Sequence, residues 1–264
     1  MKVALVQVAS PDTESQGERI SRVEKILQGL TEVDLIVLPE LWNAGYFHFD
    51  EYDHRAETVE GPTVSMCAKV AKELQTHVHI GSIVEKGDNG ELYNSSILLN
   101  PAGEIVHFYR KIHVFGYESL EASLLSPGSS LPVTDTPFGR VSGITCYDLR
   151  FPGLWTELSS RGVEVAIVPA AWPAGRREHW RLLTSARAVE HQIFVIACNA
   201  TGEQEGVTLG GHSRLVDPTG FVLGECGDGE EVLVVDLEPG QVQLVREQFP
   251  FIADRLPTYS QLAE

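Results

Sequence analysis

Three side chains that could act together on a carbonyl group stand at the ends of predicted strands: Glu40, Lys111 and Cys146. Glu40 follows a nearly continuous apolar run, Lys111 ends a hairpin strand, and Cys146 stands where a strand passes into a turn and a helix. In sheet proteins with helical cover, catalytic groups gather beyond the strand ends, because the loops there are held by a rigid frame. The sequence therefore predicts a site that combines a carboxylate, an ammonium group and a thiol.

This set of groups suits attack by sulfur on an amide. A free thiol has a pKa of about 8.5, so attack near neutral pH needs a base or a cation to supply the thiolate. Glu40 is the candidate base, Lys111 would stabilise the thiolate and the oxyanion, and the Tyr147 backbone N–H would be a second oxyanion donor. Each also has a structural interpretation: a solvated carboxylate for Glu40, an edge-strand charge for Lys111 and a small buried side chain for Cys146.

The elements that must position these residues follow a repeated order of strand and helix. Between Ile20 and Leu30, apolar residues three and four positions apart predict an amphipathic helix. Gly61-Pro62-Thr63 opens a second helix that ends near Leu74. Strands are expected at 3–8, 33–38, 79–84, 94–99 and 105–109, the last two joined as a hairpin. Nearly continuous apolar runs such as these are typical of strands that are covered on both faces.

The second half of the chain repeats this pattern. Strands are expected at 141–146, 163–168, 194–198, 213–216, 221–224 and 232–235, with helices at about 152–160 and 178–190. No linker, low-complexity tract or block of charge separates two parts. We therefore expect one domain spanning residues 1–264, of the α/β class, built from two stacked layers of sheet with helices outside each. The segment 242–251 is a candidate for contacts between subunits.

Composition excludes several classes of protein. The 264 residues carry 43% hydrophobic and 22% charged side chains, which is typical of a folded globular chain. A formal net charge of −17 repels nucleic acid and anionic membrane surfaces, so neither is expected as a partner. No apolar run is long enough to span a bilayer, and a cytoplasmic location is expected. The four cysteines form no CxxC pair, so reduced thiols are expected.

The histidines indicate neither a metal centre nor a serine hydrolase. His77 and His79 alternate along a predicted strand and therefore share one face, as a zinc-binding pair can. No acidic or cysteine ligand stands at a spacing that completes such a set, and metal binding is disfavoured. His113 and His179 have no serine partner in a triad pattern.

Three segments resemble the signature segments of the nitrilase/amidase, or carbon–nitrogen hydrolase, superfamily. They are LPELW at 38–42, YRKIHVF at 109–115 and GITCYDLRFP at 143–152. Their order and the gaps between them also match, and the likeness extends over essentially the whole chain. The resemblance implies a four-layer α-β-β-α sandwich, assembled as a homo-oligomer that is a dimer or larger, with neither a metal nor an organic cofactor.

The resemblance also assigns roles. By motif position, Glu40 is the general base, Lys111 the oxyanion donor and Cys146 the nucleophile that becomes a thioester. Glu121 matches the second glutamate that many amidases of the superfamily keep in the pocket, where it would orient the amide nitrogen or water. A helix-capping or loop role for Glu121 stays open, because Glu118 stands close by.

Two details bear on the substrate. Tyr147-Asp148 follows the nucleophile as in amidases of the superfamily, whereas true nitrilases usually carry Trp-Glu there. The segment PAAWPAGRREHW at 169–180 resembles the loop of omega-amidase-like bacterial members, which hydrolyse the terminal amide of 2-oxoglutaramate or 2-oxosuccinamate. Such substrates carry a carboxylate, which an acidic protein must hold with a local cation.

Candidate pocket residues follow from this resemblance. Arg176 is the first candidate for the carboxylate, and Arg177 and Arg150 are the next. Arg150 could instead pair within the elbow, and Arg176 or Arg177 could cap a helix start or lie in solvent. Trp172 could form a pocket wall or fill the core. The same two interpretations apply to Trp42 and Tyr46.

The leading hypothesis is thus an enzyme, a thiol amidase that acts on a small carboxylate-bearing amide and releases ammonia. An N-carbamoyl amino acid hydrolase, or an amidase of a biosynthetic intermediate, would use the same thiol chemistry. A catalytically silent oligomeric scaffold is the alternative outside enzymology, but a scaffold has no need of a charged trio.

Overall fold

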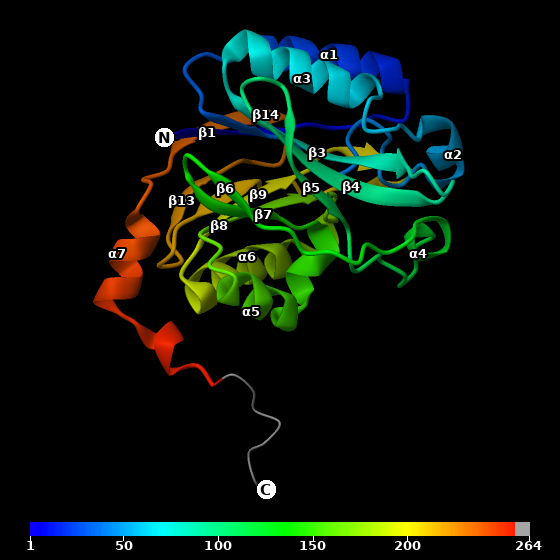
Figure 1. The fold of residues 1–264 in the computed structure, drawn as a ribbon. Helices are drawn as coiled ribbons and strands as arrows, with labels where there is room; N and C mark the ends of the chain where they lie inside the picture. Colours follow the sequence, from blue (N-terminus) through cyan, green and yellow to red (C-terminus); the bar gives the residue numbers. More distant parts are fainter. Residues whose placement is uncertain (257–264) are drawn as a thin grey trace, which may run out of the picture.

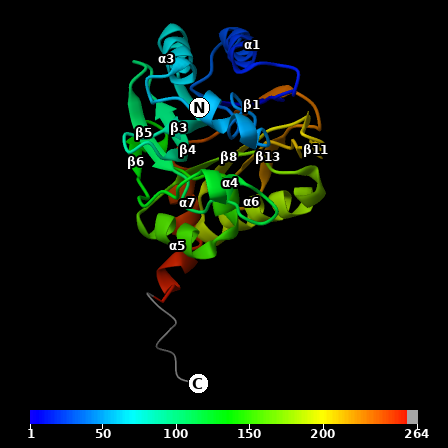
Figure 2. The ribbon, with the colours of Figure 1, turned by 90° about the vertical axis from the view of Figure 1, so that its right-hand side faces the viewer.

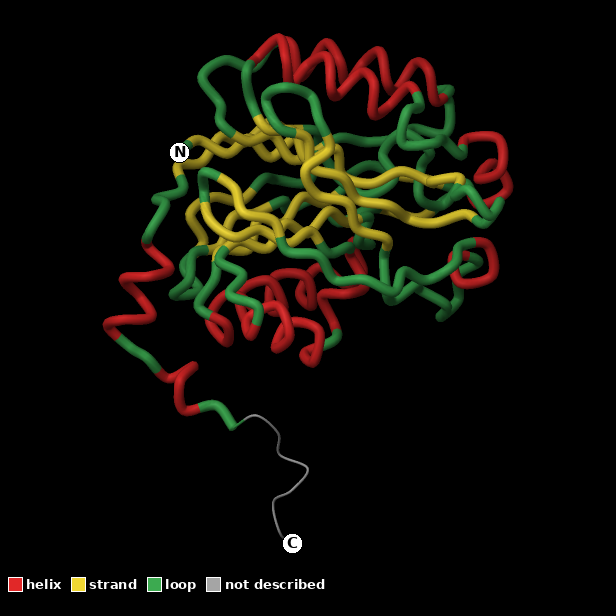
Figure 3. Tube along the Cα trace, in the orientation of Figure 1, coloured by secondary structure: helices red, strands yellow, loops and turns green. Residues whose placement is uncertain are grey.

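The computed structural model describes residues 1–256. Two six-stranded sheets lie face to face, with α-helices on the outer face of each, as Figure 1 and Figure 2 show. Figure 3 shows the strands gathered in the middle, with the longer helices above and below them. The expected four-layer α-β-β-α sandwich is confirmed. Within residues 1–256, no helix has both the length and the apolar character needed to cross a membrane.

The first sheet carries its strands in the order β14-β1-β2-β3-β4-β5. Their bounds are Glu231–Asp236, Lys2–Gln7, Leu35–Val37, His77–Lys86, Leu92–Leu99 and Ile105–Arg110. Strands β1, β2 and β3 pair in parallel, because α1 (Gln16–Gln28) and α3 (Pro62–Leu74) form the crossovers between them. Helices α1 and α3 cover the outer face of this sheet and pack on a continuous apolar core.

The second sheet has the order β13-β12-β9-β8-β7-β6. Their bounds are Val222–Glu225, Arg214–Val216, Phe194–Asn199, Val165–Ala170, Gly139–Gly143 and Thr134–Thr136. Strands β7, β8 and β9 are parallel, and the helices α5 (Pro152–Ser160) and α6 (Arg177–His191) cover the outer face. A third apolar core, which includes Leu5, Val37 and Ile167, lies between the two sheets.

Local sequence accounts for where several helices begin. Ser15 caps α1, and Glu18 completes a capping box with it. Pro62 and Pro152 stand in the first turns of α3 and α5, where the missing N–H of proline costs nothing. The apolar stripe predicted between Ile20 and Leu30 places Val23 and Leu27 in the core.

Short elements complete the described chain. They are the β-strands β10 (Glu203–Gln204) and β11 (Val207–Thr208), the α-helices α2 (Tyr52–Arg55), α4 (Glu121–Leu124) and α7 (Gln241–Gln248), and the 3-10 helices η1 (Phe49–Glu51), η2 (Cys146–Arg150), η3 (Ala174–Arg176) and η4 (Phe251–Asp254). The predicted strand 141–146 was too long, since β7 ends at Gly143. Helix α7 lies beside the sandwich in Figure 1, and only Val242 of its residues is buried.

Candidate active site

Glu40, Lys111 and Cys146 come together between the two sheets. Glu40 follows β2, Lys111 follows β5, and Cys146 begins η2 just beyond β7. Lys111 Nζ lies 2.8 Å from Glu40 Oε1, and both side chains are closed to solvent. Cys146 lines a pocket beside them. The first sheet therefore supplies the carboxylate and the ammonium group, and the second sheet supplies the thiol.

The backbone at Cys146 makes a sharp turn. Its φ of 45° lies in the left-handed region, which residues other than glycine seldom adopt. The Asp148 carboxylate accepts a hydrogen bond from the Thr145 backbone N–H at 3.0 Å and so holds this turn. Burial raises the pKa of the Cys146 thiol well above its ordinary value, and the Glu40 carboxylate raises it further. Lys111 opposes this shift, so a thiolate would depend on the ammonium group and on a base.

Both oxygens of Glu40 accept hydrogen bonds. Oε1 accepts from Lys111 Nζ and, at 2.8 Å, from Asn94 Nδ2, and Oε2 accepts from the Ala171 backbone N–H at 2.9 Å. Burial raises the pKa of the Glu40 carboxyl, Lys111 lowers it and the charge of Glu121 raises it again, for a net rise. A carboxyl group with a raised pKa is a better proton acceptor, as a general base requires.

Lys111 is a buried ammonium group between two carboxylates. Burial lowers its pKa, but the charges of Glu121 and Glu40 outweigh burial, so the pKa rises above its ordinary value. Lys111 therefore stays protonated at the neutral and mildly alkaline pH at which the enzyme is expected to act. A permanent buried cation near a thiol can hold negative charge on sulfur or on a carbonyl oxygen.

Glu121 belongs to this cluster, and its side chain does not cap α4. Oε1 accepts from Lys111 Nζ at 2.7 Å and from Asn94 Nδ2 at 3.2 Å. Oε2 accepts from the Tyr46 hydroxyl at 2.9 Å, from the Phe115 backbone N–H at 2.8 Å and from Lys111 Nζ at 3.0 Å. These donors occupy the lone pairs of the carboxylate. The geometry supports a role in holding Lys111 more directly than the expected contact with the amide nitrogen or water.

A small pocket that is open to solvent lies beside Cys146. Aromatic rings form most of its wall, and two arginines complete it; the lining includes Tyr46, Phe47, Phe115, Tyr147, Trp172, Arg150 and Arg176. Of the two expectations for Trp172, a pocket wall or a core residue, the structure supports the pocket wall. Trp42 is not a wall residue, because it is buried in the core and donates through Nε1 to the Ile80 carbonyl at 2.9 Å.

Arg150 and Arg176 bring positive charge to this wall. The Arg150 guanidinium lies 4.4 Å from the centre of the Trp172 ring, and Arg176 lies 5.6 Å from that of Phe115. Burial lowers the pKa of Arg150, and the charge of Arg176 lowers it further. Two guanidinium groups that repel each other in a small pocket favour an anionic ligand between them. The expected pairing of Arg150 within the elbow is not found, because its guanidinium lies over Trp172 and near His179 while other donors occupy the Asp148 carboxylate.

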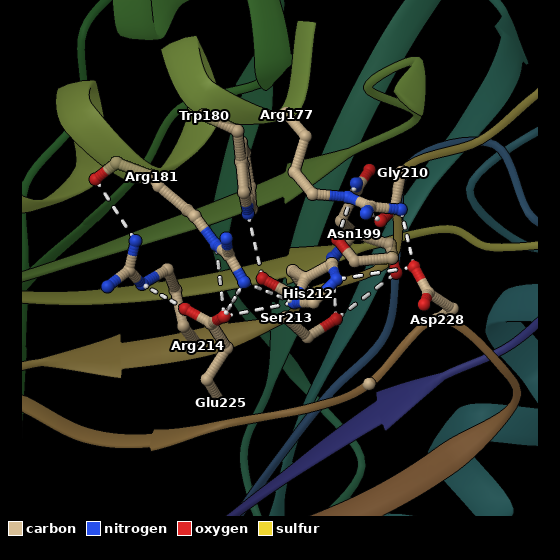
Figure 4. Close-up of polar contacts among 12 residues, drawn as sticks. Arg177, Trp180, Arg181, Asn199, Gly210, His212, Ser213, Arg214, Glu225 and Asp228 are labelled. Atoms are coloured by element: carbon tan, nitrogen blue, oxygen red, sulfur yellow. Dashed lines mark hydrogen bonds and ion pairs between the residues drawn. The ribbon is translucent and has the colours of Figure 1, made fainter. Parts of the chain in front are cut away.

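Arg177, another candidate for binding the substrate carboxylate, points away from the pocket and pairs with Asp228. Figure 4 shows its side chain reaching the Asp228 carboxylate and the Gly210 carbonyl, and the distance to Gly210 O is 3.3 Å. Arg177 is also absent from the residues that line the pocket. The expectation that Arg177 could replace Arg176 in the pocket is therefore wrong, because its ion pair with Asp228 holds it outside the pocket lining.

Asn199 holds the backbone of the pocket-wall residue Trp172. In Figure 4 it lies beside Gly210. Its Oδ1 accepts from the Trp172 backbone N–H at 2.7 Å, and its Nδ2 donates to the carbonyls of Trp172 and Gly211. Because Ala171 precedes Trp172, this arrangement also holds the N–H that binds Glu40.

Asn94 was missed in the sequence. Its side-chain amide bridges the carboxylates of Glu40 and Glu121, and its backbone carbonyl accepts from the Lys111 N–H at 2.8 Å. The sequence did carry one signal of a buried polar cluster, since Asn94, Ser95 and Ser96 interrupt an otherwise apolar strand. In the structure all three side chains are fully buried. Buried polar side chains of this kind need partners, and here the partners are the charged residues of the site.

The two histidines of the predicted pair have different partners. His79 Nε2 lies 3.0 Å from the Ser96 hydroxyl, and the His77 ring packs edge-on against Phe138. Within residues 1–256, the side chains close enough to share a cation are instead those of Asp12, His48 and Glu205. His48 already has a partner in this group, since its Nε2 lies 2.9 Å from Asp12 Oδ1.

Comparison with known proteins identifies the family. The profile of the carbon-nitrogen hydrolase family matches residues 2–247. The chain belongs to this carbon–nitrogen hydrolase family. A 2-oxoglutaramate amidase of Paenarthrobacter nicotinovorans is 37% identical over 262 residues, which are 97% of this chain and 89% of that protein. A 2-oxoglutaramate amidase of Bacillus subtilis is 34% identical, over 90% of this chain and 91% of that protein.

A solved carbon–nitrogen hydrolase has the same fold. Saccharomyces cerevisiae Nit3, a member of branch 10 of the nitrilase superfamily, superposes with a TM-score of 0.83 at 29% identity. The superposition covers 99% of this chain and 97% of that one. The expected family and the expected class, an amidase, are confirmed, and the relatives favour neither the carbamoyl hydrolase nor the scaffold. The roles of individual site residues stay predictions.

Proposed function

We propose that this carbon–nitrogen hydrolase removes the terminal amide of a small carboxylate-bearing compound of the 2-oxoglutaramate type. One observation carries the proposal. Cys146 lines a small pocket together with Arg150 and Arg176, and its thiol faces Glu40 and Lys111. A nucleophile and an anion-binding pair in one pocket suit a substrate with an amide at one end and a carboxylate at the other. The two relatives named 2-oxoglutaramate amidases support the same substrate class.

The first half of the proposed reaction forms a thioester. Glu40 takes the proton of the Cys146 thiol, and the sulfur attacks the amide carbon. The oxyanion that results is held by the Lys111 ammonium group and by the Tyr147 backbone N–H. The proton taken by Glu40 then passes to the amide nitrogen, the carbon–nitrogen bond breaks and ammonia leaves.

The second half consumes water. Glu40 takes a proton from a water molecule, whose oxygen attacks the thioester carbon, and the carbon–sulfur bond breaks. The sulfur regains a proton, so one amide and one water yield one carboxylic acid and one ammonia. Glu121 keeps Lys111 in place through both halves, since it lies 2.7 Å from Lys111 Nζ. All the groups in this scheme belong to the chain, and no cofactor is required.

We also propose the setting in which the enzyme works. The domain extends over residues 1–264, of which 257–264 lie outside the described residues. The location is cytoplasmic, and the assembly is a homodimer or a larger homo-oligomer. Four free cysteines support a reducing compartment. Exposed apolar side chains on the C-terminal elements support contacts between copies, namely Val234 at 48%, Leu244 at 57% and Phe249 at 65% exposure.

A coupled ammonia assay on the purified protein tests the substrate class. The panel contains 2-oxoglutaramate, 2-oxosuccinamate, glutamine, propionamide and an N-carbamoyl amino acid. We expect kcat/KM on the two oxo acid amides to exceed that on propionamide at least about 100-fold, since each charge-assisted contact contributes about 1.5–3 kcal/mol. Equal rates on propionamide would remove the anion-binding argument. Release of carbon dioxide with ammonia would indicate a carbamoyl hydrolase instead.

A further inference from the structure

One fully buried carboxylate joins the segment that carries Lys111 to the turn that carries Cys146. Asp148 Oδ2 accepts from the Tyr109 hydroxyl at 2.7 Å and from the Thr145 backbone N–H at 3.0 Å. Asp148 Oδ1 accepts from the His113 backbone N–H at 3.1 Å and from His113 Nδ1 at 2.7 Å. The Asp148 carboxylate therefore accepts four hydrogen bonds, which occupy its acceptor sites. None of these hydrogen bonds takes part in the proposed reaction.

The donors flank the proposed catalytic residues on both sides. Tyr109 and His113 stand two positions before and two positions after Lys111, and Thr145 directly precedes Cys146. Asp148 thus holds both ends of the short segment on which Lys111 lies. The same carboxylate holds the turn in which Cys146 adopts its positive φ of 45°.

These hydrogen bonds of Asp148 are important because the Lys111 segment and the Cys146 turn come from different sheets. Lys111 follows β5 of the first sheet, and Cys146 follows β7 of the second. Backbone ladders fix distances within a sheet, but they do not fix the distance between side chains on two sheets. The His113 ring also stacks on Phe151, which follows η2, with ring centres 3.7 Å apart and an interplanar angle of 7°. Side chains therefore connect the two segments twice.

We infer that Asp148 is a positioning residue that sets the separation between the Lys111 ammonium group and the Cys146 sulfur. The inference rests on the proposed function, in which Lys111 stabilises negative charge on sulfur and on the oxyanion. A displacement of about 1 Å at such a site costs on the order of 100-fold in rate. Asp148 needs no contact with substrate to have this effect.

Replacing Asp148 by asparagine tests the inference. The asparagine NH₂ group would face two of the four donors, so the connection between the two segments would loosen. We expect kcat for ammonia release to fall about 100-fold while KM stays within about threefold, because only charge developed during the reaction is affected. The second measurement is alkylation of Cys146 by iodoacetamide, followed by mass spectrometry of the Cys146 peptide as a function of pH.

The direction of the alkylation shift separates positioning from simple charge removal. Removing the Asp148 charge alone would lower the pKa of the Cys146 thiol and move the profile to lower pH. Withdrawal of Lys111 from the sulfur raises that pKa, so we expect the profile to move to higher pH, with about tenfold slower labelling at pH 7. Glu40, Lys111 and Arg150 are charged groups that face the thiol in the site, and all three are unchanged in the variant.

Asp217→Asn is the matched control. Asp217 is also a buried carboxylate with several donors, from Thr219, Phe221 and Gln241, but it lies outside the pocket lining. Its kcat and labelling profile should equal those of the wild type. An equal loss in both variants would mean a general effect of buried aspartates and would overturn the inference, as would a D148N profile that is unshifted or moves to lower pH.

Tyr109→Phe keeps the inference testable if the Asp148 variant fails to fold. It removes one donor and retains the ring and the Asp148 charge. We expect a three- to tenfold fall in kcat and a labelling shift in the same direction, in line with the loss of one hydrogen bond. Wild-type rates and labelling in Y109F would overturn the inference. Absence of ammonia release by the wild type would refute the proposed function, whereas the labelling profiles would still decide the role of Asp148.

Discussion

Lys111 Nζ lies 2.7 Å from Glu121 Oε1, although both side chains are closed to solvent. Glu40 approaches the same ammonium group from another side, at 2.8 Å. One cation thus separates two buried carboxylates that would otherwise repel each other. The arrangement places a permanent positive charge beside the thiol, and it makes the stability of the fold depend on the residues of the site.

Replacing Lys111 by methionine removes this cation while keeping a side chain of similar length. Glu40 and Glu121 would be left buried and unpaired, which costs about 3–5 kcal/mol of the free energy of unfolding. Ammonia release should also fall at least about 1,000-fold, because the oxyanion loses its charged donor. Urea unfolding and the ammonia assay measure the two effects.

The matched control is Lys69→Met, which removes a lysine that is 56% exposed and pairs with Glu24 at 2.9 Å. An exposed pair contributes at most about 1 kcal/mol. Equal destabilisation by the two substitutions would contradict the buried-cluster account.

Cys146→Ala should abolish ammonia release, with a residual rate at least about 10⁴-fold below that of the wild type. The substitution removes the nucleophile but only one buried atom, so the thermal unfolding temperature should change by a few degrees at most. Cys226→Ala is the control, because Cys226 is buried but does not line the pocket. Turnover by the Cys146 variant at more than a tenth of the wild-type rate would refute sulfur as the nucleophile.

The pH dependence of kcat/KM should report Glu40. The net effect of burial, Lys111 and Glu121 is to raise the pKa of this carboxyl above its ordinary value of 4.5. The base must be deprotonated to act, so activity should be lost as pH falls through a midpoint above 4.5. Because the pKa of Lys111 is raised, its deprotonation should not limit activity on the alkaline side. A profile that stays flat down to pH 4 would exclude Glu40 as the base.

Arg176→Gln should weaken binding of a carboxylate-bearing amide and leave neutral amides unaffected. We expect KM for 2-oxoglutaramate to rise about 10- to 100-fold, which corresponds to one lost charge-assisted hydrogen bond. Arg177→Gln is the neighbouring control, since Arg177 pairs with Asp228 outside the pocket. Equal effects of the two substitutions on KM would show that net charge, and not the Arg176 contact, governs affinity.

Periodicity predicted the larger elements because burial and backbone geometry act locally. The apolar stripe of α1, the proline at the start of α5 and the buried run of β8 each carry their own signal. Helix α7 was missed because a single buried residue, Val242, leaves no apolar period to detect. The predicted strand 141–146 extends beyond β7, because Ile144 is as buried as Val141 although the strand pairing stops at Gly143.

The sequence by itself determined which reactive groups the protein has, because Glu40, Lys111 and Cys146 stand in segments that resemble those of one superfamily. Only the tertiary structure decided how these groups are held. Asn94 and Asp148 act on residues distant in the chain, and Arg176 and Arg177 are neighbours that point to different partners. Contacts of this kind depend on the packing of two sheets and on the direction of each side chain, which residue type and spacing do not specify.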